Sequence, residues 1–108
     1  MDEDRTIARR RVRIVNGHGL HLRPATKFVT LVDASQSEVW VVHEGKKADG
    51  RSIVDMACLA AECGTFLDLE ARGPDAEEVI AALAELVAAG FYMTEEDYLP
   101  QPPEGSQP

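Results

Sequence analysis

The chain is organised around the stretch Asn16-Gly17-His18-Gly19-Leu20-His21-Leu22-Arg23-Pro24-Ala25-Thr26. Proline fits the first turn of a helix, where the N–H that it lacks would have no intrahelical partner, so a helix is predicted to begin at or just after His21. The first backbone N–H groups of that helix would point back at the imidazole. With the positive end of the helix dipole and the guanidinium of Arg23, they would form a site for a dianion such as phosphate. The stretch therefore predicts that His21 itself carries a phosphoryl group.

The elements around this stretch follow from the spacing of apolar residues. Strands are predicted over residues 9–15, 39–42, 46–48 and 65–72. Helices are predicted over residues 24–33, 53–64 and 74–90. The order β-α-β-β-α-β-α places the helices on one face of a mainly antiparallel sheet, which is an α+β two-layer sandwich.

Length and composition bound the class of protein. The 108 residues are expected to form one domain over residues 6–90, between a polar tail at 1–5 and an acidic, proline-rich, flexible tail at 91–108. The formal net charge of −8 argues against a nucleic-acid partner, which requires a basic face. The sequence has no apolar run long enough to predict a membrane-spanning helix. Its acidic start lacks the positively charged and then apolar segments of a secretory signal. Cys58 and Cys63 are expected as free thiols, which indicates a reducing cytoplasm. We also expect the protein to be a monomer.

The order Gly19-Leu20-His21-Leu22-Arg23-Pro24-Ala25 resembles the active-site motif of the HPr family, the histidine-containing phosphocarrier proteins of the phosphotransferase system, whose usual form is Gly-Leu-His-Ala-Arg-Pro-Ala. The likeness continues through Arg51-Ser52-Ile53 and Gly73-Pro74 and covers about residues 6–90. The resemblance implies an open-faced sandwich of four antiparallel strands with three helices on one side. It also implies that Nδ1 of His21 accepts phosphate from the phosphohistidine of phosphoenolpyruvate-dependent enzyme I and passes it to histidines of enzyme IIA-type proteins.

The residues around His21 have expected roles. Arg23 would pair with the phosphoryl oxygens, and the backbone N–H groups of Leu22 and Arg23 would bind the same group. Leu22 stands where the family has a small residue, which affects the choice of partner. The expected surface for protein partners consists of Leu22, Thr26, Lys27, Ile53 and Val54.

Ser52 has two interpretations. The spacing of Ser52 and Asp55 is that of a capping box, which explains the serine as a helix N-cap. The resemblance implies the other interpretation, because Ser52 matches the serine that a dedicated kinase phosphorylates in HPr proteins of some bacteria. Asp55 places a negative charge one turn on, where the family commonly has glycine, so the cap is favoured over regulatory phosphorylation.

No cofactor is expected, and the remaining histidines and cysteines predict no metal site. Cys58 and Cys63 have no matching His or Cys pair at ligand spacing. His18 lies in a glycine-rich loop with no helix terminus behind it, so it is interpreted as an exposed loop residue. His43 ends a predicted strand and is interpreted as structural.

Three function classes remain open. The first is a phosphocarrier, which acts jointly with its partners rather than as a stand-alone enzyme, in sugar transport or in the nitrogen-related regulatory branch called NPr. The run Gly73-Pro74-x-x-Glu77-Glu78 resembles the NPr branch. The second is a non-catalytic regulatory binding module of the same fold, against which His21 and Arg23 count. The third, a small hydrolase acting alone, lacks a second catalytic group at the loop.

Overall fold

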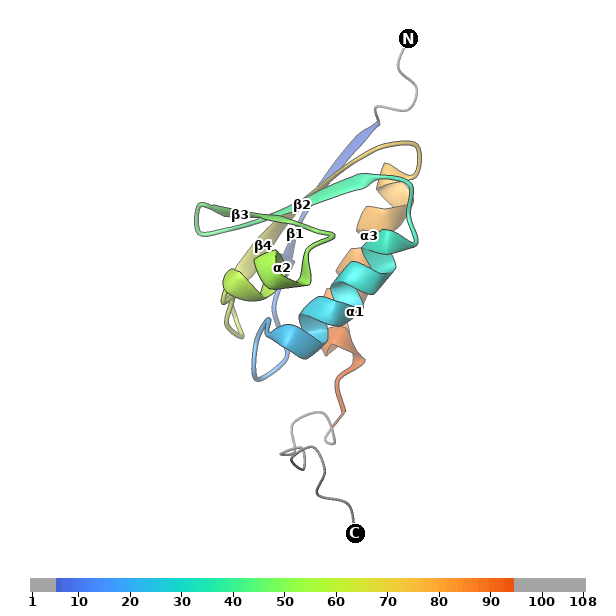
Figure 1. Ribbon diagram of the computed structural model, residues 1–108. Helices are drawn as coiled ribbons and strands as arrows, with labels where there is room; N and C mark the ends of the chain where they lie inside the picture. The colour runs from blue at the N-terminus through green and yellow to red at the C-terminus, as the bar shows by residue number, and fades with distance from the viewer. Residues whose placement is uncertain (1–5, 95–108) are drawn as a thin grey trace, which may run out of the picture.

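The computed structural model describes residues 6–94 and shows two layers, a sheet and the helices that cover one of its faces (Figure 1). Within these residues the elements are, in order, β1 (Ile7–Arg13), α1 (Leu22–Asp33), β2 (Glu38–His43), β3 (Lys46–Asp49), α2 (Ile53–Cys58), β4 (Phe66–Arg72), α3 (Ala76–Ala88) and a 3₁₀ turn, η2 (Gly90–Tyr92). The strands lie in the order β1-β4-β2-β3, and every neighbouring pair is antiparallel. The predicted α+β open-faced sandwich is confirmed.

The apolar patterns of the sequence account for the core. Leu67, Leu69 and Ala71 alternate along β4 and are buried, because they point to the face that the helices cover. The residues that recur with helical spacing on α1 and α3 are buried against this face as well. Burial of these side chains is the main favourable contribution to folding, and it holds the start of α1 at one end of the sheet.

Helix α2 is shorter than the sequence predicts. It ends at Cys58 instead of near Gly64, and Ala60 adopts a left-handed backbone conformation with a φ of 53°. The prediction continues the helix through Leu59 and Ala60, but the residues of this segment that are buried are Leu59 and Ala61. They reach the core from an irregular segment that bonds to the loop preceding α1. The prediction of a helix up to Gly64 is therefore wrong.

The folded part extends past the predicted boundary at residue 90. Phe91, within η2, is fully buried in the core. The ammonium of Lys27 on α1 donates hydrogen bonds to the carbonyl oxygens of Phe91 (3.0 Å) and Tyr92 (3.4 Å). Residues 91 and 92, predicted as the beginning of the tail at 91–108, thus pack against the domain. Residues 95–108 of that tail and the tail predicted at 1–5 lie outside the described residues.

Helix α3 has Asp75 as its N-cap, so Pro74 lies just before the helix and not in its first turn. The carboxylate of Asp75 makes no cap bond; it accepts hydrogen bonds from the hydroxyl of Ser37 (2.5 Å) and the N–H of Gln36 (3.0 Å). These bonds, the one from Ser37 first, lower the pKa of Asp75 below its ordinary value. They fasten the connection between α1 and β2 to the start of α3, at the end of the domain away from the start of α1 (Figure 1).

Candidate functional site

His21 is the N-cap residue of α1, as the sequence predicts. Its backbone is extended, with φ of −119° and ψ of −162°, and its carbonyl oxygen accepts the N–H of Ala25 at 2.9 Å. Since Pro24 has no N–H, the donors directed out of the helix start are those of Leu22 and Arg23. The first turn contains no acidic side chain. The helix therefore presents two N–H groups and the positive end of its dipole beside the imidazole.

The imidazole of His21 is half-buried, and its surroundings favour the neutral ring. Its pKa lies below the ordinary value of 6.5, first because burial withdraws the ring from water and further because of the nearby charges of His18 and Arg23. Nε2 is buried and has no hydrogen-bond partner among the described residues. A neutral imidazole carries a lone pair on one nitrogen and a proton on the other, so such a ring can act as a nucleophile without a separate base.

A tight turn holds the loop that precedes α1. The N–H of Gly19 donates to the carbonyl oxygen of Asn16 (3.1 Å), and the buried side-chain amide of Asn16 donates to the carbonyl oxygen of Gly19 (2.7 Å). The N–H of Leu20 then donates to the carbonyl oxygen of Ala61 (2.8 Å), in the irregular segment after α2. Sequence reasoning missed both Asn16 and Ala61. The pair Asn16-Gly17 is an ordinary turn signal, whereas nothing in the sequence marks Ala61.

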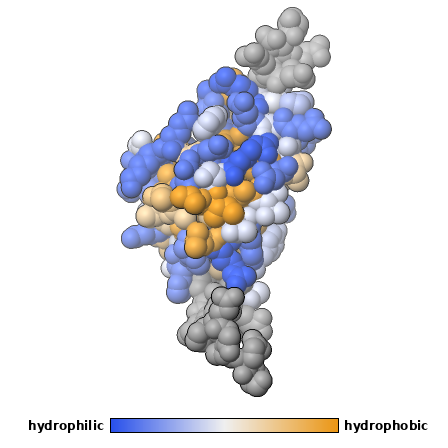
Figure 2. Space-filling model, in the orientation of Figure 1, coloured by the Kyte–Doolittle hydropathy of each residue, from blue (hydrophilic) through white to orange (hydrophobic). Residues whose placement is uncertain are grey.

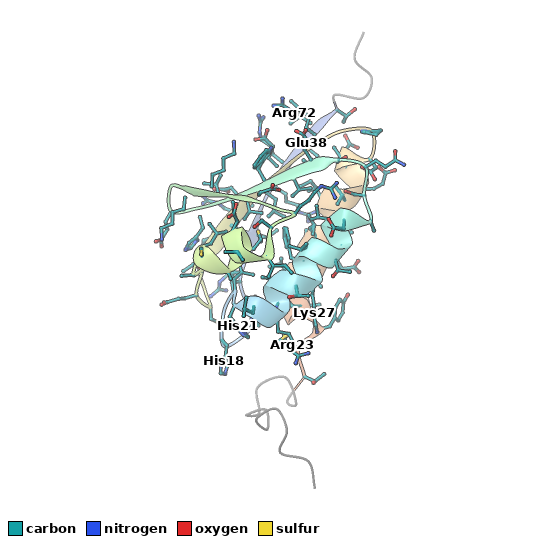
Figure 3. The ribbon with its side chains drawn as sticks, in the orientation of Figure 1. His18, His21, Arg23, Lys27, Glu38 and Arg72 are labelled. Atoms are coloured by element: carbon teal, nitrogen blue, oxygen red, sulfur yellow. The ribbon has the colours of Figure 1, made fainter. Side chains whose placement is uncertain are left out.

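Two further side chains lie at the same end of the molecule as His21 (Figure 3). The rings of His18 and His21 meet edge to face, with centroids 6.0 Å apart and planes at 63°. His18 and Arg23 are both exposed. The site thus combines a half-buried histidine with an exposed arginine and a second imidazole, a set that suits a bound anion.

An exposed apolar surface lies beside the start of α1. Leu22, in the first turn of α1, is 63% exposed, and Val54, in the first turn of α2, is 67% exposed. The helices α1 and α2 pack against each other. Figure 2 shows hydrophobic residues gathered over α2 and the nearby part of α1. Of the other residues predicted for a partner surface, Thr26 is exposed and Ile53 packs partly against the core. Lys27 is half-buried, and its ammonium bonds to the carbonyl groups of η2.

Ser52 is the N-cap of α2. Its hydroxyl accepts a hydrogen bond from the N–H of Asp55 at 3.1 Å, which is the first half of the predicted capping box. The second half does not form, because the N–H of Ser52 donates to the carbonyl oxygen of Asp49 (3.0 Å) and the carboxylate of Asp55 accepts the N–H of Asp49 (3.3 Å). The interpretation of Ser52 as a helix cap is confirmed, and its phosphorylation stays a prediction.

The other candidate ligand residues lie apart. His43 is buried, and its Nδ1–H donates to the carbonyl oxygen of Phe66 at 3.0 Å, which confirms its structural role. Cys58 and Cys63 are exposed free thiols. Across residues 6–94, no group of three or more His, Cys, Asp or Glu side chains is placed to hold a metal ion. Nor does any helix in this part of the chain have the length and apolarity to cross a bilayer.

Residues 8–89 match the protein family described as "PTS HPr component phosphorylation site", where PTS is the phosphotransferase system. The chain belongs to the HPr family. It is 43% identical over 83 residues to phosphocarrier protein NPr of Proteus mirabilis, which covers 76% of this chain and 92% of that relative. It is 38% identical over 80 residues to phosphocarrier protein HPr of Neisseria meningitidis serogroup A, which covers 74% of this chain and 90% of the relative.

Solved HPr structures have the same fold. HPr-C-His from Thermoanaerobacter tengcongensis superposes with a TM-score of 0.76 at 34% identity, over 81% of this chain and 98% of that one. The chain is therefore a phosphocarrier protein of the phosphotransferase system, of the HPr or NPr kind. The resemblance carried by the motif around His21 is confirmed at the level of the family.

Proposed function

We propose that His21 accepts a phosphoryl group on Nδ1 from the phosphohistidine of enzyme I, which derives it from phosphoenolpyruvate, and passes it to a histidine of an enzyme IIA-type protein. The observation that carries the proposal is the position of His21 at the start of α1, where the N–H groups of Leu22 and Arg23 and the helix dipole converge. Phosphoryl transfer depends chiefly on positioning and on neutralisation of charge, and this arrangement offers both.

The two ring nitrogens of His21 are not equivalent. Burial of Nε2 supports Nδ1 as the atom that attacks phosphorus. The lone pair of Nδ1 forms the new N–P bond while the bond from phosphorus to the donor's nitrogen breaks, and that electron pair stays on the donor. Because no proton moves in this step, the lowered pKa of His21 favours it by keeping the ring neutral. Arg23 neutralises part of the charge on the phosphoryl oxygens.

Partner proteins would dock on the surface formed by Leu22, Thr26 and Val54, with Ile53 and Lys27 at its margin. The exposed side chains of Leu22 and Val54 support this proposal, because apolar residues that a partner covers completely contribute much of the affinity of an interface. Leu22→Ala should therefore weaken the complex with enzyme I, measured by calorimetry, without unfolding the carrier.

The NPr branch is a second candidate, favoured by the 43% identity to the Proteus mirabilis NPr against 38% to the Neisseria HPr. The chemistry at His21 would be the same, and the donor and acceptor proteins would differ. Parallel phosphorylation rates with enzyme I of the sugar system and with its nitrogen-related counterpart distinguish the branches: the true donor should be faster by orders of magnitude.

Regulatory phosphorylation of Ser52 by a serine kinase has less support. A phosphate there would lose the cap bond to the N–H of Asp55 and would lie beside the carboxylate of the same residue. We therefore keep Ser52 as a structural cap. Incubation with a serine kinase should give no acid-stable phosphate at this position.

Incubation with enzyme I and phosphoenolpyruvate tests the main proposal. The chain should gain a label that survives base and is released by mild acid, as expected for an N–P bond. His21→Ala should abolish this label. Arg23→Ala should fold normally and accept phosphate more slowly, because the backbone N–H groups remain while one charge-assisted partner is lost. His18→Ala should still be labelled at His21.

Two results would overturn the assignment. Full acid-labile labelling of His21→Ala would move the acceptor to another histidine. A wild-type chain that binds enzyme I but gains no acid-labile phosphate would instead be a non-catalytic binding module of the same fold.

A further inference from the structure

A second imidazole lies beside the one that the proposed function uses. His18 is exposed, and its ring meets the ring of His21 edge to face with the centroids 6.0 Å apart. Two imidazoles joined directly by a hydrogen bond would be closer than this. The two rings are therefore neighbours that are not hydrogen-bonded to each other directly.

The backbone holds His18 in this position. His18 is a central residue of the turn that Asn16 and Gly19 close with two hydrogen bonds, of 3.1 and 2.7 Å. The next residue, Leu20, is tied to the carbonyl oxygen of Ala61. Since the turn is fixed at both ends, His18 needs only side-chain rotation to reach a group on His21, which keeps the entropic cost low.

We propose that His18 is a positioning residue of the phosphorylation site, and that its ring N–H donates a hydrogen bond to the phosphoryl group carried by His21. The inference rests on the proposed function, because it requires a phosphoryl group on His21. Arg23 on α1 and His18 on the preceding loop lie at the same end of the molecule as His21 (Figure 3). His18 forms no bond to phosphorus and takes up no proton from the transfer; it stabilises the phosphorylated state.

The oxygens of a phosphoryl group are charged, so a ring N–H that donates to them makes a charge-assisted hydrogen bond. Arg23 acts together with His18 to lower the pKa of His21, whereas the ammonium of Lys27 is bonded to carbonyl oxygens of η2.

The test follows the decay of the phosphorylated chain by phosphorus NMR after enzyme I is removed. His18→Ala should shorten the lifetime of the phosphohistidine about tenfold, the size expected for one hydrogen bond to a charged group. His18→Asn keeps an N–H donor, so its phosphohistidine should live longer than that of His18→Ala.

A second measurement needs no phosphoryl group. In an NMR titration of the unphosphorylated chain, His18→Ala should raise the pKa of His21 toward its ordinary value, because one of the charges that lower it is gone. Val15→Ala, a change at an exposed residue of the same loop, should leave both the pKa of His21 and the lifetime unchanged.

The two measurements separate the possible failures. A wild-type chain that takes up no acid-labile phosphate overturns the proposed function and, with it, this inference. A chain that is labelled normally but decays at the same rate in wild type and His18→Ala overturns the role of His18 alone. If the pKa of His21 is the same in His18→Ala as in wild type, the role of His18 is also overturned, because the two rings would then not be neighbours in solution.

Discussion

The backbone N–H of Leu20 donates a hydrogen bond to the carbonyl oxygen of Ala61 at 2.8 Å. This bond joins the loop that leads to His21, the proposed phosphorylation site, to the irregular segment after α2. The preceding residue, Gly19, has a φ of 72°, and a Cβ atom at this position would overlap the same carbonyl oxygen. Position 19 therefore requires glycine for two reasons, the left-handed backbone and the close approach of two chain segments.

Gly19→Ala should lower the free energy of unfolding by about 1–3 kcal/mol, because alanine is strained at this φ and its Cβ displaces Ala61. Urea denaturation measures the loss. Gly17→Ala is the matched control, since a Cβ there would meet no atom within 4 Å, and it should change stability by less than about 0.5 kcal/mol. Equal losses in both variants would contradict the close packing at Ala61.

Leu83→Ala should lower the free energy of unfolding by about 2–5 kcal/mol, because Leu83 lies in the middle of the buried face of α3 and is fully buried. Leu22→Ala removes the same atoms from a side chain that is 63% exposed, so its loss in the same urea experiment should stay below about 1 kcal/mol. A loss below about 0.5 kcal/mol at Leu83 would mean that α3 does not pack on the sheet in this way.

The start of α1 is predictable from the sequence because the signals that define it are local. Pro24 limits where the helix begins, and apolar residues then recur at helical spacing. The alternation of Leu67, Leu69 and Ala71 is equally local, and it defines the buried face of β4. The placement of His21 at a helix terminus, and with it the family's chemistry, follows from such short-range patterns.

The relationships that the sequence does not reveal join residues that are far apart along the chain. Asp75 reads as an acid in the first turn of a helix, yet its carboxylate binds Ser37, 38 positions away. Lys27 reads as a surface residue for partners, yet it bonds to Phe91, 64 positions away. Ala61 reaches the core from an irregular backbone, and the apolar spacing around it does not mark where α2 ends.

Phe91→Ala should cost about 3–5 kcal/mol, because this fully buried ring anchors the segment after α3. Tyr92→Ala is the control, since its side chain is 59% exposed, and thermal unfolding should show a much smaller change.

Removal of residues 95–108 should leave the Tm nearly unchanged, because the contacts of Phe91 and Lys27 remain. A fall of several degrees would show that the removed segment contributes to the fold.

Stability should depend on pH through His21. Burial, and then the charges of His18 and Arg23, hold the pKa of this residue below its ordinary value of 6.5. The unfolded chain therefore binds a proton that the folded chain does not, and the free energy of unfolding should fall as pH drops below about 6.5, until the folded pKa is passed. His21→Gln lacks this effect, so its free energy of unfolding relative to wild type should rise as the pH falls from about 8 to about 5. Parallel pH profiles for the two proteins would contradict the lowered pKa.

The hydrogen bonds from Lys27 to Phe91 and Tyr92 also determine where a tag or a solid support can be attached to the carrier. They hold η2 against α1, at the end of the molecule that carries His21, whereas β1 begins at the opposite end of the sheet (Figure 1). In a chain cut after residue 94, a tag or dye attached at the new end would therefore emerge at the end of the molecule that carries His21. Attachment there should slow phosphoryl exchange with partners, and attachment just before residue 6 should leave it intact.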